Sequence, residues 1–498
     1  MGNYSVPESI RAMKPKGTMV KRIKNGYYVY NYSSKQVRVT DKAGVKRWKT
    51  QTQMGECIGL ITEADGFIPN EGFVSKDEIT GRNYGNYAFA MHCSSETYSR
   101  LCSVFHPDDA KQIYAAAIIF FVDGFTYMTS MKDVFETSYL PLEFEKAHLG
   151  YEALHALYAN LGTRNGKVRK FESMMLDRSS KRVAIDGHVI ACTSERNDLS
   201  EFGYKAAKLG SEQVNWLTAY DVVDGLPLLS HIYSGADPDK ISVQALFERC
   251  DFTNTEFLVD RGFNTDPDKQ LMSSNGNTYI VPMISNRKDY ASVIKTLKFD
   301  KRKYFVFNKD NYASMVYYAE FLSEDGTSRY IAFQDTTRAG AERHDYVKAL
   351  TAGRSGYTED GLVENELYFG LFLLETNNFD LTAEEVFCHY KDRWSIETYY
   401  NYVRNDADFN ALYQQDYFCM QGLSFIVTVS GMIYHDVKKV AEASKLSVKE
   451  IMREMKKLKI SLEGNKWIVQ NKIKSVRVAA EKVGFEIPKY LTNKSLST

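Results

Sequence analysis

The chain has 498 residues, is 44% hydrophobic and 25% charged, and balances 63 basic against 63 acidic residues. This composition is typical of a globular protein with about three domains, and it argues against a long disordered chain. Seven scattered cysteines without a CxxC pair argue against a disulfide framework or a zinc site and indicate a reducing cytosol. The longest apolar runs, at 114–122 and 425–434, are too short to span a bilayer, so no membrane partner is expected.

The balanced total charge hides an uneven distribution. Residues 1–50 carry twelve Lys or Arg against two acidic residues, and residues 435–480 carry twelve against five. The rest of the chain is therefore acidic. Basic ends and an acidic centre are expected if the ends bind phosphate and the centre gathers carboxylates for metal, although Lys-rich ends are also ordinary solvated surface.

The N-terminal part changes character along its length. Tyr- and Val-rich runs between residues 19 and 75 are interrupted by Asn, Gly and Ser, which predicts β-hairpins. From His106 to Glu172 the apolar residues recur at spacings of three and four, which predicts helices. We interpret residues 1–175 as a β-then-helical accessory region that binds DNA.

Residues 176–290 alternate strands and helices in a recognisable order. RVAIDGH predicts a short strand ending at Asp186, and the Asp224–Gly225 turn predicts a hairpin in the following strands. A helix, a buried strand ending at Asp260 and a fifth strand ending near Ile284 follow. Three antiparallel strands followed by alternating helix and strand predict an α/β fold with an RNase H-like mixed sheet, of which this is the first part.

The remaining chain divides into three regions. Residues 291–384 show strand-like runs with polar turns and no helical rhythm, which predicts a β-rich insertion. Residues 385–436 form the second part of the catalytic core, with one long helix predicted from Thr382 to about Asn410. Residues 437–498 are a basic C-terminal region that binds DNA or a second copy of the chain, and its Val448, Ile451, Met452 and Met455 suit dimerisation at least as well as DNA.

Two aspartates stand at the ends of short apolar strands. Asp186 and Asp260 are each followed within two residues by Gly. In α/β sheets, ligand sites form beyond the carboxyl ends of strands, and two carboxylates on neighbouring strands repel unless a cation lies between them. Taken singly, either Asp-Gly is more often ordinary turn chemistry. Taken together, they suit Mg²⁺, which prefers one or two carboxylates with waters and phosphate oxygens.

The predicted helix after Thr382 carries an unusual stripe. Tyr390, Arg393, Glu397 and Arg404 lie at offsets of 0, 3, 7 and 14, so a regular helix presents all four on one face. That set is poor material for a hydrophobic core, and it suits a face that completes a metal site beside DNA. The alternative is a solvated face joined by an Arg393–Glu397 pair.

Three blocks together resemble a known family. AIDGH, LVDRGF and Y-x2-R-x3-E-x6-R resemble the signature blocks of bacterial insertion-sequence DDE transposases, in the branch with a Tyr-Arg-Glu-Lys motif and a β-domain inserted before the glutamate helix. The resemblance covers about residues 181–436, and GYYVYNYSS and IGLITEADGFIPN also resemble the start of such transposases.

The resemblance implies roles for single residues. Asp186, Asp260 and Glu397 match the catalytic triad, which would bind two Mg²⁺ ions with Mn²⁺ as a substitute. The residues expected to contact DNA are Tyr390, Arg393, Arg404, Trp394 beside the stripe and Arg261 directly after Asp260. Arg404 stands where the family pattern has Lys, which keeps the charge but changes the geometry. His188 has no assigned role.

The implied reaction is DNA cleavage followed by strand transfer, in a cut-and-paste movement. The partners would be terminal inverted repeats and target DNA, bound by a homodimer in the synaptic complex, in the bacterial cytoplasm and at the nucleoid when DNA is bound. Three alternatives remain open at this stage. They are an RNase H-like DNA endonuclease without strand transfer, a DNA-binding relative that has lost catalysis, and a metal-dependent hydrolase of small phosphate esters.

Overall fold

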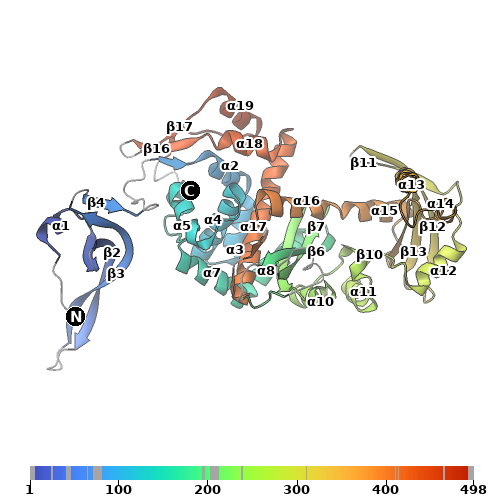
Figure 1. The fold of residues 1–498 in the computed structure, drawn as a ribbon, viewed down its shortest axis with the longest axis horizontal. Helices are drawn as coiled ribbons and strands as arrows, with labels where there is room; N and C mark the ends of the chain where they lie inside the picture. Colours follow the sequence, from blue (N-terminus) through green and yellow to red (C-terminus); the bar gives the residue numbers. More distant parts are fainter. Residues whose placement is uncertain are drawn as a thin grey trace. The chain divides into compact units, whose positions relative to one another are not determined.

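The structure of the protein is a computed structural model. In it the chain forms two compact units, Met1–Gly81 and Arg82–Thr498 (Figure 1). The structure describes residues 6–23, 26–40, 46–63, 66–70, 81–192, 197–201, 212–236, 239–309, 311–409, 411–412, 414–463 and 466–491. The two units are considered separately below.

The first unit is a short helix with an antiparallel sheet. Its elements are α1 (Glu8–Ala12), β1 (Thr18–Ile23), β2 (Gly26–Thr40), β3 (Lys46–Thr62) and β4 (Gly66–Pro69), with the strands in the order β1-β2-β3-β4. The sequence predicted separate short strands here, but GYYVYNYSS and KQVRVT form one continuous strand, β2. Its buried core is small and consists of Ile10, Val29, Ile58 and Ile61. The outer parts of β2 and β3 therefore extend beyond any core as a two-stranded ribbon (Figure 1).

A layer of helices opens the second unit. They are α2 (Gly85–Cys93), α3 (Ser95–Val104), α4 (Pro107–Asp123), α5 (Met128–Thr137), α6 (Leu140–Glu143), α7 (Tyr151–Thr163) and α8 (Gly166–Arg178). The long helix α17 (Tyr417–Ala443) packs against α7 and α4. Glycine allows the close approach of α7 and α17, because a Cβ at Gly162 or Gly422 would lie 2.1 Å from a backbone oxygen of the other helix.

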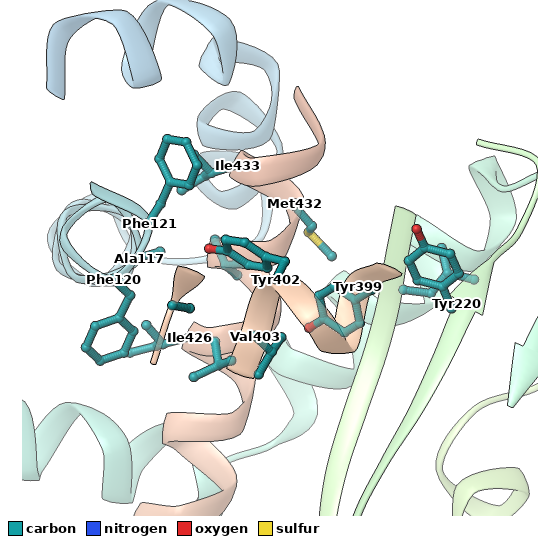
Figure 2. Packing of buried hydrophobic residues seen from close by; sticks show 14 of the residues in the cluster. Ala117, Phe120, Phe121, Tyr220, Tyr399, Tyr402, Val403, Ile426, Met432 and Ile433 are labelled. Carbon is teal, nitrogen blue, oxygen red and sulfur yellow. The ribbon is translucent and has the colours of Figure 1, made fainter. Parts of the chain in front are cut away.

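Helix α17 is long and apolar enough to cross a membrane, although 83% of its most apolar window is buried inside the protein. In the described part of the chain, α4 and α5 pass the same test only as a pair bent by 87°. One hydrophobic cluster runs from these helices into the sheet. Figure 2 shows the place where Phe121 of α4, Ile433 of α17 and Tyr402 meet.

The central sheet has the strand order expected of an RNase H-like core. Its five core strands are β6 (Arg182–Cys192), β7 (Gln213–Asp221), β8 (Leu226–Ser234), β9 (Glu256–Val259) and β10 (Thr278–Pro282), in the order β10-β9-β6-β7-β8. Strands β6, β9 and β10 are parallel, and β7 is antiparallel to its two neighbours. The predicted hairpin at Asp224–Gly225 is present, with Gly225 at φ +72°. The connections contain α10 (Asp239–Arg249), η2 (Arg261–Phe263), α11 (Asp266–Met272) and η3 (Ser274–Gly276).

The insertion extends this same sheet. Its strands β11 (Tyr304–Lys309), β12 (Tyr312–Leu322), β13 (Arg329–Asp335) and β14 (Leu371–Thr376) are antiparallel in the order β11-β12-β13-β14, and β14 pairs with β10. The expectation that helical rhythm stops here was wrong, because α12 (Lys288–Thr296), α13 (Thr336–Thr351) and α14 (Glu359–Glu364) lie among the strands.

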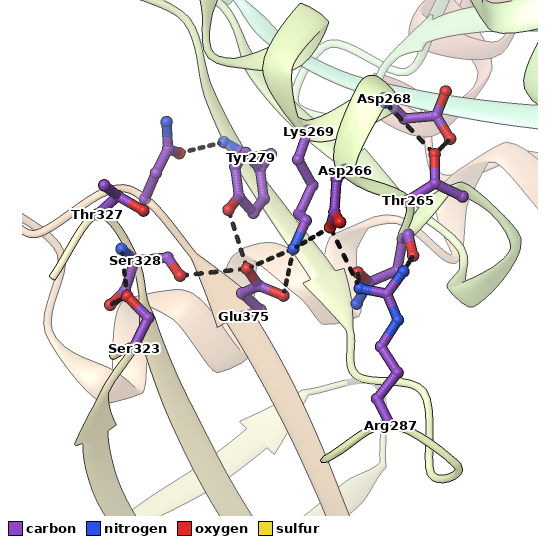
Figure 3. Close-up of polar contacts among 12 residues, drawn as sticks. Thr265, Asp266, Asp268, Lys269, Tyr279, Arg287, Ser323, Thr327, Ser328 and Glu375 are labelled. Atoms are coloured by element: carbon purple, nitrogen blue, oxygen red, sulfur yellow. Dashed lines mark hydrogen bonds and ion pairs between the residues drawn. The ribbon is translucent and has the colours of Figure 1, made fainter. Parts of the chain in front are cut away.

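A buried carboxylate fastens the insertion to the core. Glu375 of β14 accepts hydrogen bonds from Lys269 of α11 at 3.0 Å, Tyr279 of β10 at 3.1 Å and Ser328 at 3.1 Å (Figure 3). Every donor comes from a different segment. The insertion and the core therefore share one polar network as well as one sheet.

The elements after the insertion return over the core. They are α15 (Ala383–Asp392), α16 (Ser395–Asn401), the π-helical turn η4 (Tyr402–Asp406) and β15 (Ala411–Leu412), which pairs with the far end of β6. The predicted single helix from Thr382 to Asn410 is thus broken. A capping box between Thr382 and Glu385 starts α15 as the sequence suggests.

The C-terminal region packs on the same unit. It contains α18 (Val448–Met455), β16 (Lys459–Glu463), β17 (Lys466–Gln470), α19 (Lys474–Lys482) and β18 (Tyr490–Leu491), and its sheet is completed by β5 (Gly81–Asn83). Ile451 and Met455 are fully buried, and Val448 and Met452 pack against the main core. The apolar face of α18 is therefore used inside the chain, which contradicts its predicted availability for dimerisation.

Candidate active site

Asp186 and Asp260 stand side by side on neighbouring parallel strands. Strands β6 and β9 pair Arg182 with Glu256 and Ile185 with Val259, and the two aspartates follow directly. The structure therefore brings them to the same place on the sheet, as the sequence predicted. The predicted end of the first strand was wrong, because β6 continues past Asp186 to Cys192. It continues because β7 still pairs with it after β9 has ended at Val259.

The surroundings of Asp186 favour its neutral form. Its side chain is 18% exposed, and its pKa is raised to about 6. Burial is the largest cause, and Glu397 and Asp260 also raise the pKa, whereas Arg393 and the backbone amide of Gly187 lower it. Asp186 thus interacts electrostatically with both other predicted acids, which come from two distant segments of the chain. Among the described residues, no three such side chains already stand close enough to hold a metal ion.

This coupling has a consequence for stability. The pKa of Asp186 is about 6 in the folded protein and 3.8 in a model peptide, so the folded state loses stability as pH rises through this window. We expect Asp186→Asn to raise the free energy of unfolding at pH 8 in a chelating buffer, by on the order of 2 kcal/mol. The gain should shrink at pH 5. Urea melts measure both values.

A matched control is Asp345→Asn, because Asp345 is exposed on α13. It should change the free energy of unfolding by less than about 0.5 kcal/mol at either pH. Divalent metal should stabilise the wild type but not the Asp186→Asn protein. An Asp186→Asn protein less stable than the wild type at pH 8 without metal would contradict the assigned repulsion.

Arg393 and Tyr390 lie against the aspartates. Nη1 of Arg393 is 3.9 Å from Oδ2 of Asp186, and the guanidinium lies over the Tyr390 ring, 5.7 Å from its centroid. Only 13% of the Arg393 side chain is exposed. Burial raises the pKa of Tyr390 to about 12, so its hydroxyl keeps its proton and can donate. The pair supplies one positive charge and one neutral donor beside the carboxylates.

The chain tightens between α15 and α16, immediately before Glu397. The amides of Arg393, Trp394, Ile396 and Glu397 donate to carbonyls three residues earlier, at 3.1–3.2 Å, so the chain tightens into a 3₁₀ turn. Beyond it, Tyr399 and Tyr400 anchor α16 from its buried side. Tyr399 stacks on Tyr220 of β7 with centroids 5.7 Å apart (Figure 2). The Tyr400 hydroxyl donates to the backbone oxygen of Asp186 at 2.7 Å.

The predicted DNA-binding residues separate into two groups. Trp394 is 71% exposed at the start of α16, and Arg261 is exposed at the start of η2. Arg404 lies on the π-helical turn, where its guanidinium donates to the Tyr400 carbonyl and to Asn401. The stripe assumed a regular helix, and the 3₁₀ and π turns change that spacing.

His188 also has a defined position. It follows Asp186 by two residues and therefore shares its face of β6. Its ring stacks on Tyr400 with centroids 5.1 Å apart. This contact supports the tyrosine that holds the backbone of Asp186.

A cleft of about 1060 Å³ adjoins these residues. Asp260, Arg261, Tyr390, Arg393 and Trp394 line it. The insertion and α15 contribute further lining residues, which include Phe307, Lys309, Tyr312, Arg338, Phe372 and Lys391. The cleft is thus mixed aromatic and cationic, which suits a nucleic-acid backbone with its bases.

Sequence reasoning missed the insertion's share of this cleft. Lys391 shows why, since its ammonium lies 5.1–5.9 Å from the ring centroids of Tyr312, Phe372 and Phe387. Burial among these rings lowers its pKa. The one signal in the sequence was that Lys391 directly follows Tyr390, a residue of the stripe. The strands of the insertion have similar sequences whether or not they face the site, so they carried no such signal.

Part of the chain matches a known protein family. The family model described as the transposase DDE domain matches residues 177–413. This part of the chain is therefore similar to that domain. The matched region begins at the end of α8, just before β6, and ends after β15, so it contains the three acids, the insertion and the cleft. The helices before α8, the C-terminal region and the first unit lie outside it.

Two further comparisons add little to the DDE domain match. No curated protein matches the chain. A solved structure of piggyBac transposase in a synaptic complex with hairpin DNA is similar at 10% identity and a TM-score of 0.37, over 75% of this chain and 78% of that one. So low a TM-score does not support an inference about fold or function.

Proposed function

We propose that the protein is a transposase that cuts DNA at the ends of a mobile element and joins those ends to target DNA. The observation that carries the proposal is the coupling of Asp186 with Asp260 and Glu397 inside the DDE domain. Three carboxylates from three segments, with one buried arginine, would contribute little to the stability of the fold. They are a suitable set of oxygen ligands for divalent metal.

Asp186, Asp260 and Glu397 are the oxygen ligands that would hold two Mg²⁺ ions, with Mn²⁺ as a substitute. Bound there, the ions would supply charge to activate the attacking oxygen and to stabilise the leaving oxygen. Arg393 neutralises part of the carboxylate charge and can donate to a phosphate oxygen. Tyr390 donates from its neutral hydroxyl. Trp394 and the aromatic residues of the cleft can stack on bases close to the cut.

The reaction has two steps of the same kind. Water attacks the phosphorus, the bond to the 3′ oxygen breaks, and a 3′-OH and a 5′-phosphate result. The freed 3′-OH then attacks a phosphodiester of the opposite strand or the target, and another 3′ oxygen leaves. These steps would move the element by cut-and-paste, with two copies of the chain bridging its two ends.

The test uses the full chain with a supercoiled plasmid that carries both element ends, with and without Mg²⁺. The proposal predicts cleavage at the ends and joined products with target DNA, both dependent on metal. Cleavage without joining would instead identify an endonuclease. End binding without cleavage would identify a relative that has lost catalysis.

We propose that the ribbon of β2 and β3 binds the element ends. Residues 35–49 carry six Lys or Arg and one Asp. The described side chains at 31–36 and 48–56 are all exposed, so these parts of β2 and β3 are uncovered. A two-stranded ribbon without a core beneath it is marginally stable alone, and a basic one fits the major groove of DNA.

We expect the double variant Lys35→Gln/Lys49→Gln to bind duplex ends more weakly at physiological salt. The slope of log affinity against log salt should fall by about one unit for each lost phosphate contact. Fluorescence anisotropy with a labelled end duplex measures the slope. The matched control is Lys167→Gln/Lys170→Gln on the exposed face of α8. Equal slopes for both variants and the wild type would remove the ribbon from DNA binding.

A further inference from the structure

A second polar cluster lies on the same face of the sheet as the acids, four residues earlier along β6 and β9. Nε of Arg182 donates to Oε2 of Glu256 at 3.1 Å, across the first paired positions of β6 and β9. Nδ1 of His389, on α15, lies 2.7 Å from the same Oε2, and its Nε2 lies 2.6 Å from Nη2 of Arg182. The three side chains thus form a closed triangle that ties α15 to two strands.

Hydrogen-bond chemistry fixes the direction of each contact. A guanidinium can only donate, so Nε2 of His389 accepts from Arg182. The proton of the ring is therefore on Nδ1, which donates to Glu256. Each of the three side chains contacts the other two, and the exposed fractions of Glu256 and His389 are only 12% and 14%. Half-buried, directional contacts of this kind hold a helix more firmly than exposed ion pairs do.

Asp392 extends the cluster to the insertion. Its carboxylate lies 3.6 Å from Nη1 of Arg182 and 2.6 Å from Nζ of Lys309 on β11. Asp392 is the last residue of α15. The end of that helix is therefore fixed from two sides immediately before the 3₁₀ turn that leads to Glu397.

The spacing of these residues repeats that of the acids. Arg182 precedes Asp186 by four residues, and Glu256 precedes Asp260 by four, so alternation along each strand puts both pairs on one face. His389 likewise precedes Arg393 by four residues and Glu397 by eight. The chain from α15 to α16 thus lies along the strands with His389 over one pair and Arg393 over the other.

We propose that Arg182, Glu256 and His389 are positioning residues, which set the rotation and height of α15 so that Arg393 and Glu397 face Asp186 and Asp260. The triangle touches no reacting atom. Its effect passes through the helix and across the 3₁₀ turn. The proposal rests on the proposed function for its catalytic consequence, whereas the placement of the helix can be tested without catalysis.

The first test measures cleavage by His389→Phe, which keeps a ring and removes both polar atoms. Single-turnover cleavage of saturating, pre-bound ends should fall roughly 10- to 100-fold, since small displacements of positioned groups have effects of this size. End affinity should stay within about twofold. His389→Gln retains a donor and an acceptor and should recover part of the rate. His344→Phe, on the exposed surface of α13, is the matched control.

The second test needs no activity. Hydrogen–deuterium exchange of the metal-free protein should show faster exchange at 383–401 in His389→Phe and in Arg182→Met, with the central strands unchanged. Faster exchange throughout the second unit would show a general structural role and overturn the proposal. A His389→Phe protein that cleaves at the wild-type rate would also overturn it. If the wild type does not cleave at all, the proposed function fails, and the exchange result still decides the placement of the helix.

Discussion

The Asp186→Asn protein should bind element ends as the wild type does and cut them roughly a thousandfold more slowly. Asn has the size of Asp but offers one neutral oxygen where the carboxylate offers two charged ones. Asp186 is electrostatically coupled to both Asp260 and Glu397, and Arg393 lies beside it, so its charge is central to the set. A loss of ligand charge should therefore appear in the chemical step and leave DNA binding unaffected.

The measurement is single-turnover nicking of pre-bound ends in Mg²⁺, with affinity taken from a binding assay on the same preparation. Glu397→Gln and Asp260→Asn should lose as much. Because the three acids act as a unit, the triple variant should be scarcely slower than any single one. Asp345→Asn should cut normally. Asp186→Asn that still nicks at a tenth of the wild-type rate would remove this residue from the catalytic set.

Arg249→Met should lower the free energy of unfolding by about 3–5 kcal/mol. Arg249 ends α10, and its guanidinium makes two hydrogen bonds with Glu172 of α8, at 2.9 and 2.7 Å. The two side chains are 8% and 2% exposed. Burial raises the pKa of Glu172 even beside Arg249, so the arginine is what makes a charged carboxylate tolerable there. Without it, the buried carboxylate has lost its counter-charge.

Urea denaturation of the full chain gives the free energy, provided that the second unit unfolds in one transition. The double variant Glu172→Leu/Arg249→Met should recover most of the loss, because replacing a whole buried pair by apolar residues is often neutral. The control is Arg343→Met, whose partner Glu366 is half exposed, and it should cost less than about 1 kcal/mol. A loss of less than 1 kcal/mol in Arg249→Met would show that water or another group replaces the arginine.

The sequence indicated the acids because of where they stand relative to strands. Asp186 and Asp260 stand at or beyond apolar runs that are buried on both faces, and it was the pair that pointed to a metal site. The RNase H-like order of the core strands followed from the same runs. Glu397 was predicted from helical spacing, and the structure couples it electrostatically to Asp186 although the helix is broken before it.

Arg404 lies beyond two departures from regular helical spacing, so its role at the DNA stays a prediction. Local hydrogen bonds override the average geometry of a helix, and neither the 3₁₀ turn at Arg393 nor the π turn at Tyr402 has a reliable sequence signal. The apolar face of α18 was misread for a related reason. An amphipathic helix shows that one face is buried, but it does not show whether the same chain or another molecule covers it.

The sequence by itself determined which residue types could do chemistry, and in which strands and helix they lie. These facts depend on local periodicity, which each segment carries alone. The tertiary structure decided the rest: that β14 joins the insertion to β10, that Lys391 enters the cleft, and that Arg182, Glu256 and His389 meet. Those contacts join residues separated by up to some two hundred positions, and only the packing of the whole core brings such residues together.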